Sequence, residues 1–338
     1  MNVLKNLLES VPVSVYVNFD GTRAWIADPA FEMEVQLKGT PSRPVAFPAQ
    51  VLANLLEGAD MEIFLKDDQL RVSRPGFLAE VRTAETTPPT ILRQIEESIA
   101  QVSGDFVKTF RSALSLGRRN ISYTAKVLVE VEDRVKVVAT DGYCLHVHTL
   151  EAEVYQKARL HLPVTAAEAF RVLNRDEPLT LHKAWAGKAL VVESPNARVG
   201  LALADPHYPD YHQAIPTRSP EGYIQAPRKE LVRALRRALV VAEARNHAVR
   251  LSVREGLCVE ALDDNFSPVS KEALPGEGQR ELFINAAYLV GALEEIEGDE
   301  VHIAIYTGPR APLVEVKDER FYALISALCT PQNPPSEG

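Results

Sequence analysis

The chain has few of the residues that build disulfide-linked or metal-held frameworks. Its 338 residues include three cysteines, Cys144, Cys258 and Cys329, which lie far apart and form no CxxC pair. Neither a disulfide framework nor a zinc ribbon is therefore indicated. We expect these thiols to be reduced and mostly buried.

Long apolar runs are also missing. No stretch approaches the roughly 18 uninterrupted apolar residues that a membrane span needs. The N-terminal MNVLKNLLESVP has too short an apolar core and no small-residue cleavage site for a signal peptide. With 46% hydrophobic and 25% charged residues, the sequence is typical of a cytoplasmic globular protein that can bury sizeable cores.

Familiar catalytic signatures are absent as well. The sequence contains no GxxxxGK[ST], GxGxxG, HExxH or GxSxG pattern. His146 and His148 fall on one face of a predicted strand, but no nearby residue supplies the remaining ligands of a metal site. An ordinary strand face is the favoured interpretation, and we expect no enzyme, no metal and no cofactor.

Positive charge is scarce overall but locally concentrated. The formal net charge of −9 disfavours a protein that coats nucleic acid over its whole surface, although a basic face remains compatible with it. Through residue 242, a helix predicted over 227–244 carries five cations against the single carboxylate of Glu230. Four of them share one side, opposite a stripe of Leu231, Ala234, Leu235 and Leu239. These four are Lys229, Arg233, Arg236 and Arg237.

A second basic group falls at the equivalent place of an earlier repeat. It lies on and just after a helix predicted over 105–116, and its members are Lys108, Arg111, Arg118 and Arg119. One basic helix is usually a solvated face, whereas two at equivalent positions favour contact with a phosphate backbone, without reading of sequence. The acidic pair Glu294 and Glu295 is most simply a solvated helix face.

A threefold internal repeat organises the chain. Residues 13–37, 125–150 and 248–274 each predict two alternating strands, a turn and a third strand, with Asp28, Asp141 and Asp264 in equivalent places. Asp141-Gly142 predicts a type I′ turn, in which both central residues have positive φ. Cys144 beside it is expected to be a small buried hydrophobic residue.

Each repeat predicts the order helix, three strands, helix, three strands. The first helices fall at 2–11, 105–116 and 227–244, and the second at 47–58, 162–174 and 284–298. Alternating strands need one face covered, and two amphipathic helices per copy can cover it. We therefore predict an α+β fold of three similar domains at 1–90, 91–212 and 213–329, with a polar tail at 330–338.

Four motifs carry a resemblance to a known family. VVATDGYCL (137–145), HYPDYHQAIP (207–216), FINAAYLVGALEEIEGDEVHIAI (283–305) and FYALISAL (321–328) resemble segments of the bacterial DNA sliding clamps, the beta subunits of DNA polymerase III. The resemblance implies that three clamp domains form half of a ring, which closes as a head-to-tail homodimer. It also implies that the ring encircles duplex DNA and tethers the polymerase as a processivity factor.

The resemblance implies three sets of contact residues. A pocket for peptides of the polymerase III alpha subunit, the clamp loader and other factors would use Thr124, Thr140, Gly142, Tyr143, Cys144, Leu145, Pro209, Gln213, Ala214, Leu324, Ile325, Ala327 and Cys329. The residues facing DNA would be the two basic groups together with Tyr123. The dimer would join a first-domain edge strand with the third domain through Phe77, Ala79, Val81, Val240 and Val241.

Several positions depart from the family's pattern. Positions that are commonly basic hold Gln50, Val51, Glu57, Val164 and Thr165. In addition, Ser326 replaces a proline in the last strand, and the tail at 330–338 is an addition. The alternative is therefore an accessory or paralogous clamp that binds partner peptides but is poorly loaded on DNA.

Overall fold

The computed structural model describes residues 7–8, 15–36, 43–55, 62–66, 69–117, 126–163, 169–242, 245–307 and 311–329. The chain divides into two compact units. Unit 1 comprises Met1–Ser115, Ala125–Val137 and Leu150–His207, and unit 2 comprises Leu116–Thr124, Val138–Thr149 and Tyr208–Gly338.

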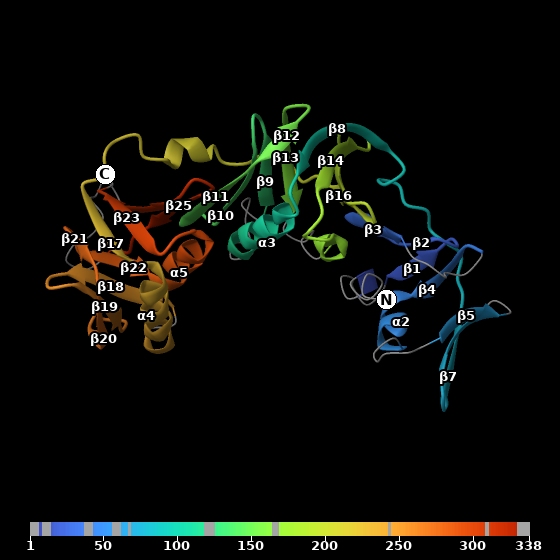
Figure 1. The fold of residues 1–338 in the computed structure, drawn as a ribbon, viewed down its shortest axis with the longest axis horizontal. Coiled ribbons are helices and arrows are strands. Elements are labelled where there is room, and N and C mark those ends of the chain that lie inside the picture. The colour runs from blue at the N-terminus through green and yellow to red at the C-terminus, as the bar shows by residue number, and fades with distance from the viewer. Residues whose placement is uncertain are drawn as a thin grey trace. The chain divides into compact units, whose positions relative to one another are not determined.

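The described part of unit 1 is mostly antiparallel sheet, accompanied by α-helices (Figure 1). Its elements are β1 (Tyr16–Phe19), β2 (Arg23–Ala27), β3 (Phe31–Gln36), β4 (Val45–Pro48), α2 (Ala49–Leu55), β5 (Glu62–Lys66), β6 (Gln69–Arg74), β7 (Phe77–Arg82), β8 (Ile95–Val102), α3 (Asp105–Gly117), β9 (Lys126–Val131), β12 (Ala152–Val154), β13 (Ala158–Pro163), β14 (Leu179–Ala184), β15 (Ala189–Glu193) and β16 (Ala197–Ala202). β10 (Val135–Thr140) runs from unit 1 into unit 2.

The described part of unit 2 holds strands of two sheets and two longer helices. Its elements are β11 (Cys144–Leu150), the 3₁₀ helix η2 (Tyr211–Ala214), β17 (Gly222–Pro227), α4 (Arg228–Val241), β18 (Ala248–Val253), β19 (Leu257–Leu262), β20 (Pro268–Leu274), β21 (Glu277–Gly278), β22 (Leu282–Asn285), α5 (Ala286–Glu295), β23 (Glu300–Tyr306), β24 (Leu313–Lys317) and β25 (Phe321–Ser326). None of the helices within the described ranges is long and apolar enough to span a membrane.

The observed order of elements confirms the predicted α+β class. From α4 onward, a helix, three long strands, a helix and three strands follow one another as the pattern predicted. Strands β17 and β22, which immediately precede α4 and α5, were not predicted because each has only a few residues of alternation. The helix predicted at 2–11 lies outside the described residues apart from Leu7 and Leu8. Of the helix predicted at 162–174, residues 164–168 lie outside the described residues, Leu162 and Pro163 belong to β13, and residues 169–172 are 3₁₀ instead of α-helix. The three-domain division remains a prediction.

A nine-stranded sheet runs through unit 1 in the order β12-β8-β14-β15-β16-β3-β2-β1-β4. At its middle, β16 pairs with β3, so that Val199 lies opposite Met33. Both side chains are fully buried, as are Ile26 and Val191 in neighbouring strands. The strand from the second repeat therefore completes a sheet that begins in the first.

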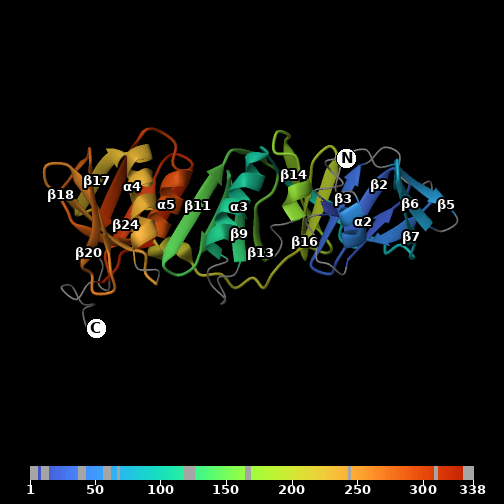
Figure 2. The same cartoon turned by 90° about the horizontal axis from the view of Figure 1, so that it is seen from below.

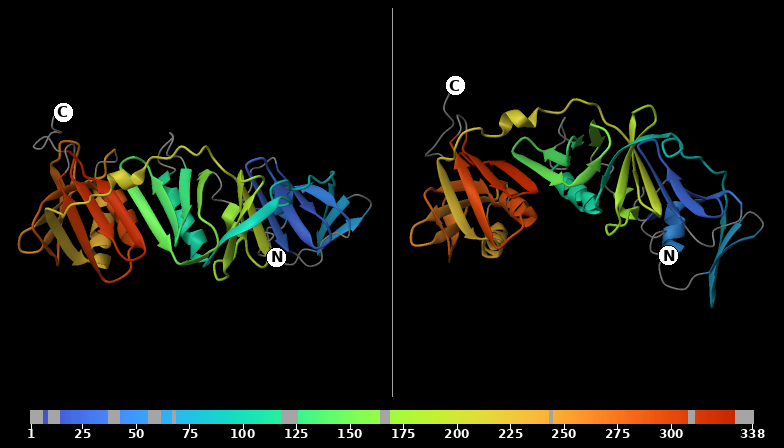
Figure 3. Two further views of the ribbon diagram at one scale, coloured as in Figure 1. Left: turned by 90° about the horizontal axis from the view of Figure 1, so that it is seen from above. Right: turned by 45° about the horizontal axis from the view of Figure 1, so that its top comes forward.

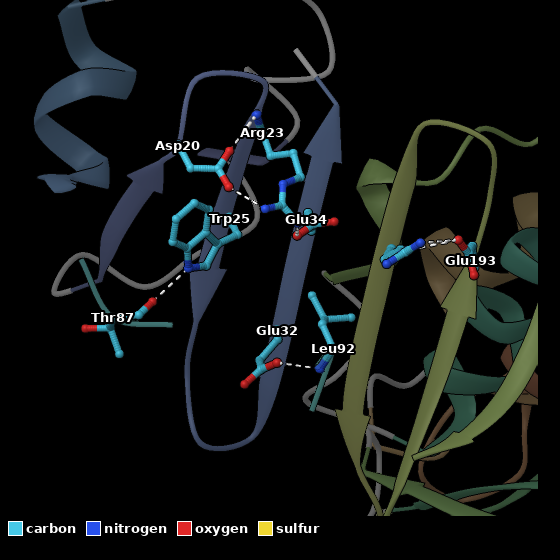
Figure 4. Close-up of polar contacts among 9 residues, drawn as sticks. Asp20, Arg23, Trp25, Glu32, Glu34, Thr87, Leu92 and Glu193 are labelled. Atoms are coloured by element: carbon cyan, nitrogen blue, oxygen red, sulfur yellow. Dashed lines mark hydrogen bonds and ion pairs between the residues drawn. The ribbon is translucent and has the colours of Figure 1, made fainter. Parts of the chain in front are cut away.

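Side chains of unit 1 fix the segment that joins these two repeats (Figure 4). The Glu32 carboxylate accepts hydrogen bonds from the backbone N–H groups of Thr90, at 2.5 Å, and Leu92, at 2.9 Å. The Trp25 indole donates to the carbonyl of Thr87 at 2.7 Å. Because Glu32 is only 3% exposed, its charge is held by these N–H groups instead of by water.

In unit 2, α4 and α5 lie side by side on one face, and the strands lie behind them (Figures 2 and 3). Strands β11-β25-β24-β23-β17-β21 are consecutive members of a nine-stranded sheet, and β20-β19-β18-β22 form a second sheet with β20 at an edge. The Asn285 side chain caps α5 by accepting from the N–H groups of Ala287 and Tyr288. The helices thus cover the apolar faces of the alternating strands, as the sequence pattern predicted.

Two local predictions were wrong. Gly142 has a φ of 90°, but Asp141 is not among the described non-glycine residues with positive φ, so the turn is not of type I′. Cys144 is buried, as expected, whereas Cys258 is half-buried and Cys329 is exposed. Cys329 lies three residues beyond the end of β25 at Ser326.

Candidate functional site

The predicted basic stripe of α4 is present. Leu231, Ala234 and Leu235 are buried, with Val232 and Ala238 beside them, and Leu239 is half-buried. Lys229, Arg233, Arg236 and Arg237 are exposed on the opposite side. The helical period therefore separated the two faces correctly.

Three of these four cations are not free. The Arg236 guanidinium contacts the Glu294 carboxylate at 2.6 Å, and the Lys229 ammonium contacts the Asp299 carboxylate at 2.9 Å. Arg237 binds both oxygens of Glu272, one of them through Nε at 2.8 Å. These contacts could not be predicted from the sequence, because the carboxylates lie 35 to 70 positions away.

Arg228, the fifth cation of α4, has a structural role. Its Nε donates to the Gly298 carbonyl at 2.7 Å, and its Nη1 donates to the Leu293 carbonyl at 3.2 Å. It therefore satisfies carbonyls near the C-terminal end of α5, where helices leave such groups without partners.

The second basic group is only partly visible. Lys108 is exposed and Arg111 is half-buried on α3. The remaining predicted DNA-facing residues, Arg118, Arg119 and Tyr123, lie outside the described residues.

The Asp141 carboxylate builds the corner between β10 and β11. Its Oδ1 accepts hydrogen bonds from the N–H groups of Tyr143, at 3.0 Å, and Cys144, at 2.9 Å. Thr140 Oγ1 donates to the Cys144 carbonyl at 2.8 Å and accepts from the Gly142 N–H at 3.1 Å. The turn is thereby closed, and it presents Tyr143 outward with 67% of that residue exposed.

The predicted pocket residues on β11 and β25 divide between two faces. Cys144 lies opposite Ile325, and Leu145 lies opposite Leu324. Neighbouring residues of a strand point to opposite faces, so these two pairs cannot line the same wall. His148 shares a face with Cys144 and lies 4.0 Å from Glu295 of α5, so Cys144 and Ile325 face the helix. Leu145 and Leu324 therefore lie on the other face.

The segment between the last two repeats contributes exposed groups. Pro209 is half-buried, and Gln213 and Ala214 are exposed on η2. Asp210 accepts from the Gln213 side chain at 3.1 Å, and the Tyr208 hydroxyl donates to the Val138 carbonyl of β10 at 3.3 Å. Thr124, the other predicted pocket residue near this segment, lies outside the described residues.

Ala327 and Cys329 line a cleft that does not include the corner between β10 and β11. The cleft has a volume of about 410 Å³, and its wall also includes Phe283 and Pro312. Past the end of β25, these residues therefore face the strands of the third repeat.

Sequence reasoning missed Tyr288. Its hydroxyl donates a hydrogen bond to Asp141 Oδ2, the oxygen that the turn leaves open. The only signal in the sequence was a tyrosine in the first turn of a predicted helix, which carries no information about a partner so far away. Tyr288 thus joins the predicted set at the corner.

The predicted dimer residues lie on the edge strand β7 and at the end of α4, where they are exposed or half-buried. β7 is an edge strand of the sheet β5-β6-β7, where Phe77 is exposed and Ala79 and Val81 are half-buried. At the end of α4, Val240 is 83% exposed and Val241 is 50% exposed. Exposed apolar residues in these positions are typical of an interface.

The paired histidines of β11 are packed into apolar surroundings. His146 and His148 are buried, and both rings contact the Phe321 ring with centroids 5.0 and 4.7 Å away. Within the described ranges, no three or more His, Cys, Asp or Glu side chains are grouped to hold a metal ion.

Comparisons with known proteins agree with this arrangement. No protein-family profile matches the chain. It is 25% identical to the beta sliding clamp of Synechococcus elongatus over 296 residues, which cover 82% of this chain and 77% of that protein.

Solved structures match the fold over nearly the full chain. The DNA polymerase III beta subunit of Pseudomonas aeruginosa matches with a TM-score of 0.77 and 18% identity over 97% of this chain and 96% of its own. The sliding clamp of Bacillus subtilis matches with a TM-score of 0.79 and 20% identity over 97% of both chains. The chain is therefore similar in fold over nearly its whole length, and in sequence over most of it, to the bacterial beta sliding clamps, the beta subunits of DNA polymerase III.

Proposed function

We propose that the chain is a DNA sliding clamp: two copies close into a ring around duplex DNA and tether the replicative polymerase to it. The observation that carries this function is the likeness to clamps of two bacteria, which spans 96–97% of both chains in each case. Such proteins are processivity factors, so the function needs no catalytic group. A replication factor of this kind acts in the cytoplasm, where bacterial DNA is.

The proposed contact with DNA is electrostatic. The exposed stripe of α4 and the cations of α3 offer positive charge without a recognition motif, which suits phosphates and not base edges. Non-specific binding of this kind has a Kd of about 10⁻⁴–10⁻⁶ M at physiological salt. Weak contact suffices, because a closed ring is retained by topology and must still slide.

The proposed ring would close through edge strands of the two copies. Three modules per chain, at 1–90, 91–212 and 213–329, would give six in a dimer. In the described sheets β7 and β20 are both edge strands, and exposed Phe77 on β7 and Val269 on β20 suit pairing between copies. Joining two different surfaces head to tail closes a ring when the rotation allows it.

The proposed partner site lies at the corner that Asp141 builds. Exposed Tyr143, Gln213 and Ala214 would contact a peptide, and Leu145 and Leu324 would form the apolar floor. The expected partners are peptides of the polymerase III alpha subunit and of the clamp loader. The alternative of an accessory clamp is not favoured by these comparisons.

Retention on circular DNA tests the function. The protein is loaded on a nicked circle with a bacterial clamp loader, and the circle is then cut once. We expect retention before the cut and release after it, because a ring leaves only at an end. Release from the intact circle at the same rate would contradict the proposal, and a monomeric mass in solution would do so earlier.

A further inference from the structure

The α4 stripe raises a question of charge balance. A helix that faces phosphates gains most from cations that have no other partner, yet three of the four exposed cations of α4 hold carboxylates of the same chain. Arg233 makes no ion pair with any residue in the described ranges, and it alone is directly available. The three acidic partners have no role in the function proposed above.

We propose that Glu272, Glu294 and Asp299 are built-in counter-charges that compete with DNA phosphates for the cations of α4 and so weaken the clamp's hold on DNA. This inference rests on the proposed function, and it assigns three acidic residues that set the strength of that hold. Glu294 is exposed on α5, as a solvated helix face requires, and it also pairs with Arg236.

The three carboxylates come from three different elements around α4. Glu272 lies on β20, Glu294 on α5, and Asp299 in the turn between α5 and β23. α4 packs against both α5 and β20, so the backbone of the fold carries these carboxylates to the stripe (Figure 2). On an ordinary solvated helix face, we would not expect three cations to be paired each with a carboxylate from a different element.

The three ion pairs have defined geometry, and they are exposed enough for a phosphate to replace the carboxylate. Arg237 binds both oxygens of Glu272, the two-point geometry in which guanidinium–carboxylate pairs are strongest. This hydrogen bond raises the pKa of Arg237 and lowers that of Glu272, and the Lys229 ammonium lowers the pKa of Asp299. The cations are still 60–65% exposed, so a phosphate can reach and replace each carboxylate.

Competition has a measurable signature. A cation that must leave a carboxylate to contact a phosphate gains little, and the freed carboxylate then repels the DNA. Both the affinity and the number of phosphates neutralised are therefore lower than the count of cations suggests. The dependence of binding on salt reports that number directly.

The experiment compares charge-neutralising variants of the full-length protein. We would measure binding of a short fluorescent linear duplex by anisotropy over a series of NaCl concentrations, for the parent, E272Q, E294Q, D299N and the triple variant. The matched control is E230Q, because Glu230 is exposed on the same helix and makes no ion pair with a described residue. Thermal unfolding and mass confirm that each variant is folded and dimeric.

Each pair-breaking variant should tighten binding by about 1.4- to 5-fold, the range that exposed ion pairs span. The slope of log K against log salt should steepen by up to about 0.9 for each cation released. E230Q should leave the slope unchanged. An unchanged slope in the triple variant, or an equal effect of E230Q, would overturn the inference.

A double-mutant cycle separates pairing from general charge. If Glu294 acts through Arg236, then E294Q should have no effect in an R236Q background. Equal tightening in both backgrounds would refute the competition. Failure of the two proposals is distinguishable, because loss of retention on nicked circles concerns the clamp function, whereas retention with unchanged salt slopes concerns only the counter-charges.

Discussion

The Tyr288 hydroxyl donates a 2.6 Å hydrogen bond to the carboxylate of Asp141, 147 positions earlier in the chain. The other oxygen of that carboxylate holds the N–H groups of Tyr143 and Cys144. One side chain therefore fixes the turn and also attaches it to the first turn of α5. The shape of the proposed partner site depends on a residue of the following repeat.

Tyr288→Phe should loosen this corner. Loss of a hydrogen bond to a charged, largely buried group costs about 1.5–3 kcal/mol in the free energy of unfolding, and urea titration would measure it. Binding of a clamp-loader peptide should weaken at the same time. Tyr223→Phe is the control, since its hydroxyl makes no hydrogen bond with a described residue. Equal stability of the two variants would show that the contact is not formed in solution.

Exposed residues at the corner are better probes of peptide binding than buried ones. Leu145 and Ile325 are only 5% and 0% exposed, so a charge there would damage the fold as well as the site. Tyr143→Ala and Ala214→Asp should each weaken peptide binding at least tenfold, as measured by calorimetry, and change stability by less than about 0.5 kcal/mol. Tyr155→Ala, at another exposed tyrosine, should leave peptide binding unchanged. Peptide binding that survives both substitutions would place the site elsewhere.

Dimerisation should depend on the exposed apolar ends. Val240→Glu and Phe77→Asp each place a charge where the proposed interface excludes water, so sedimentation should show monomers at concentrations where the parent is a dimer. Val51→Glu carries the same change to an exposed valine of α2 and should leave the mass unchanged. A dimer that persists in both interface variants would argue against these edges.

Unit 1 should lose stability in mild acid. Burial lowers the pKa of both His161 and His182, and in each case it is the largest cause. Below a pH of about 6.5, the unfolded chain therefore binds protons that the folded chain resists, so stability falls as pH falls. Between pH 7.5 and 5.5, the midpoint temperature of thermal unfolding should fall less in His161→Gln/His182→Gln than in the parent. His302→Gln, at an exposed histidine, should behave like the parent. Identical pH profiles in all three proteins would rule out His161 and His182 as the cause.

The helical and strand periods predicted the α+β class and the two faces of α4 because they are local properties of the sequence. The split of α4 into a face with Leu231 and Leu235 and a face with Arg233 and Arg236 follows from spacing alone. The turn at Asp141 was placed correctly, but its type was not, because the carboxylate of Asp141 and not a positive φ closes it.

What escaped prediction depends on distant neighbours. The partners of Arg236 and Arg237, and the contact of Tyr288, are set by which elements pack together, and no period in the sequence records that. The opposite orientations of Cys144 and Leu145 follow from strand geometry, so the sequence could have warned that both would not line one pocket.

The seam between β3 and β16 has a consequence for dissecting the molecule. A fragment beginning at residue 91 keeps β16 but loses the strand that covers its backbone donors and acceptors. An unpaired edge strand of that kind can pair with strands of other chains, so such a fragment should aggregate even though its own residues are unchanged. A repeat recognised in the sequence is therefore not a fragment that stays soluble on its own.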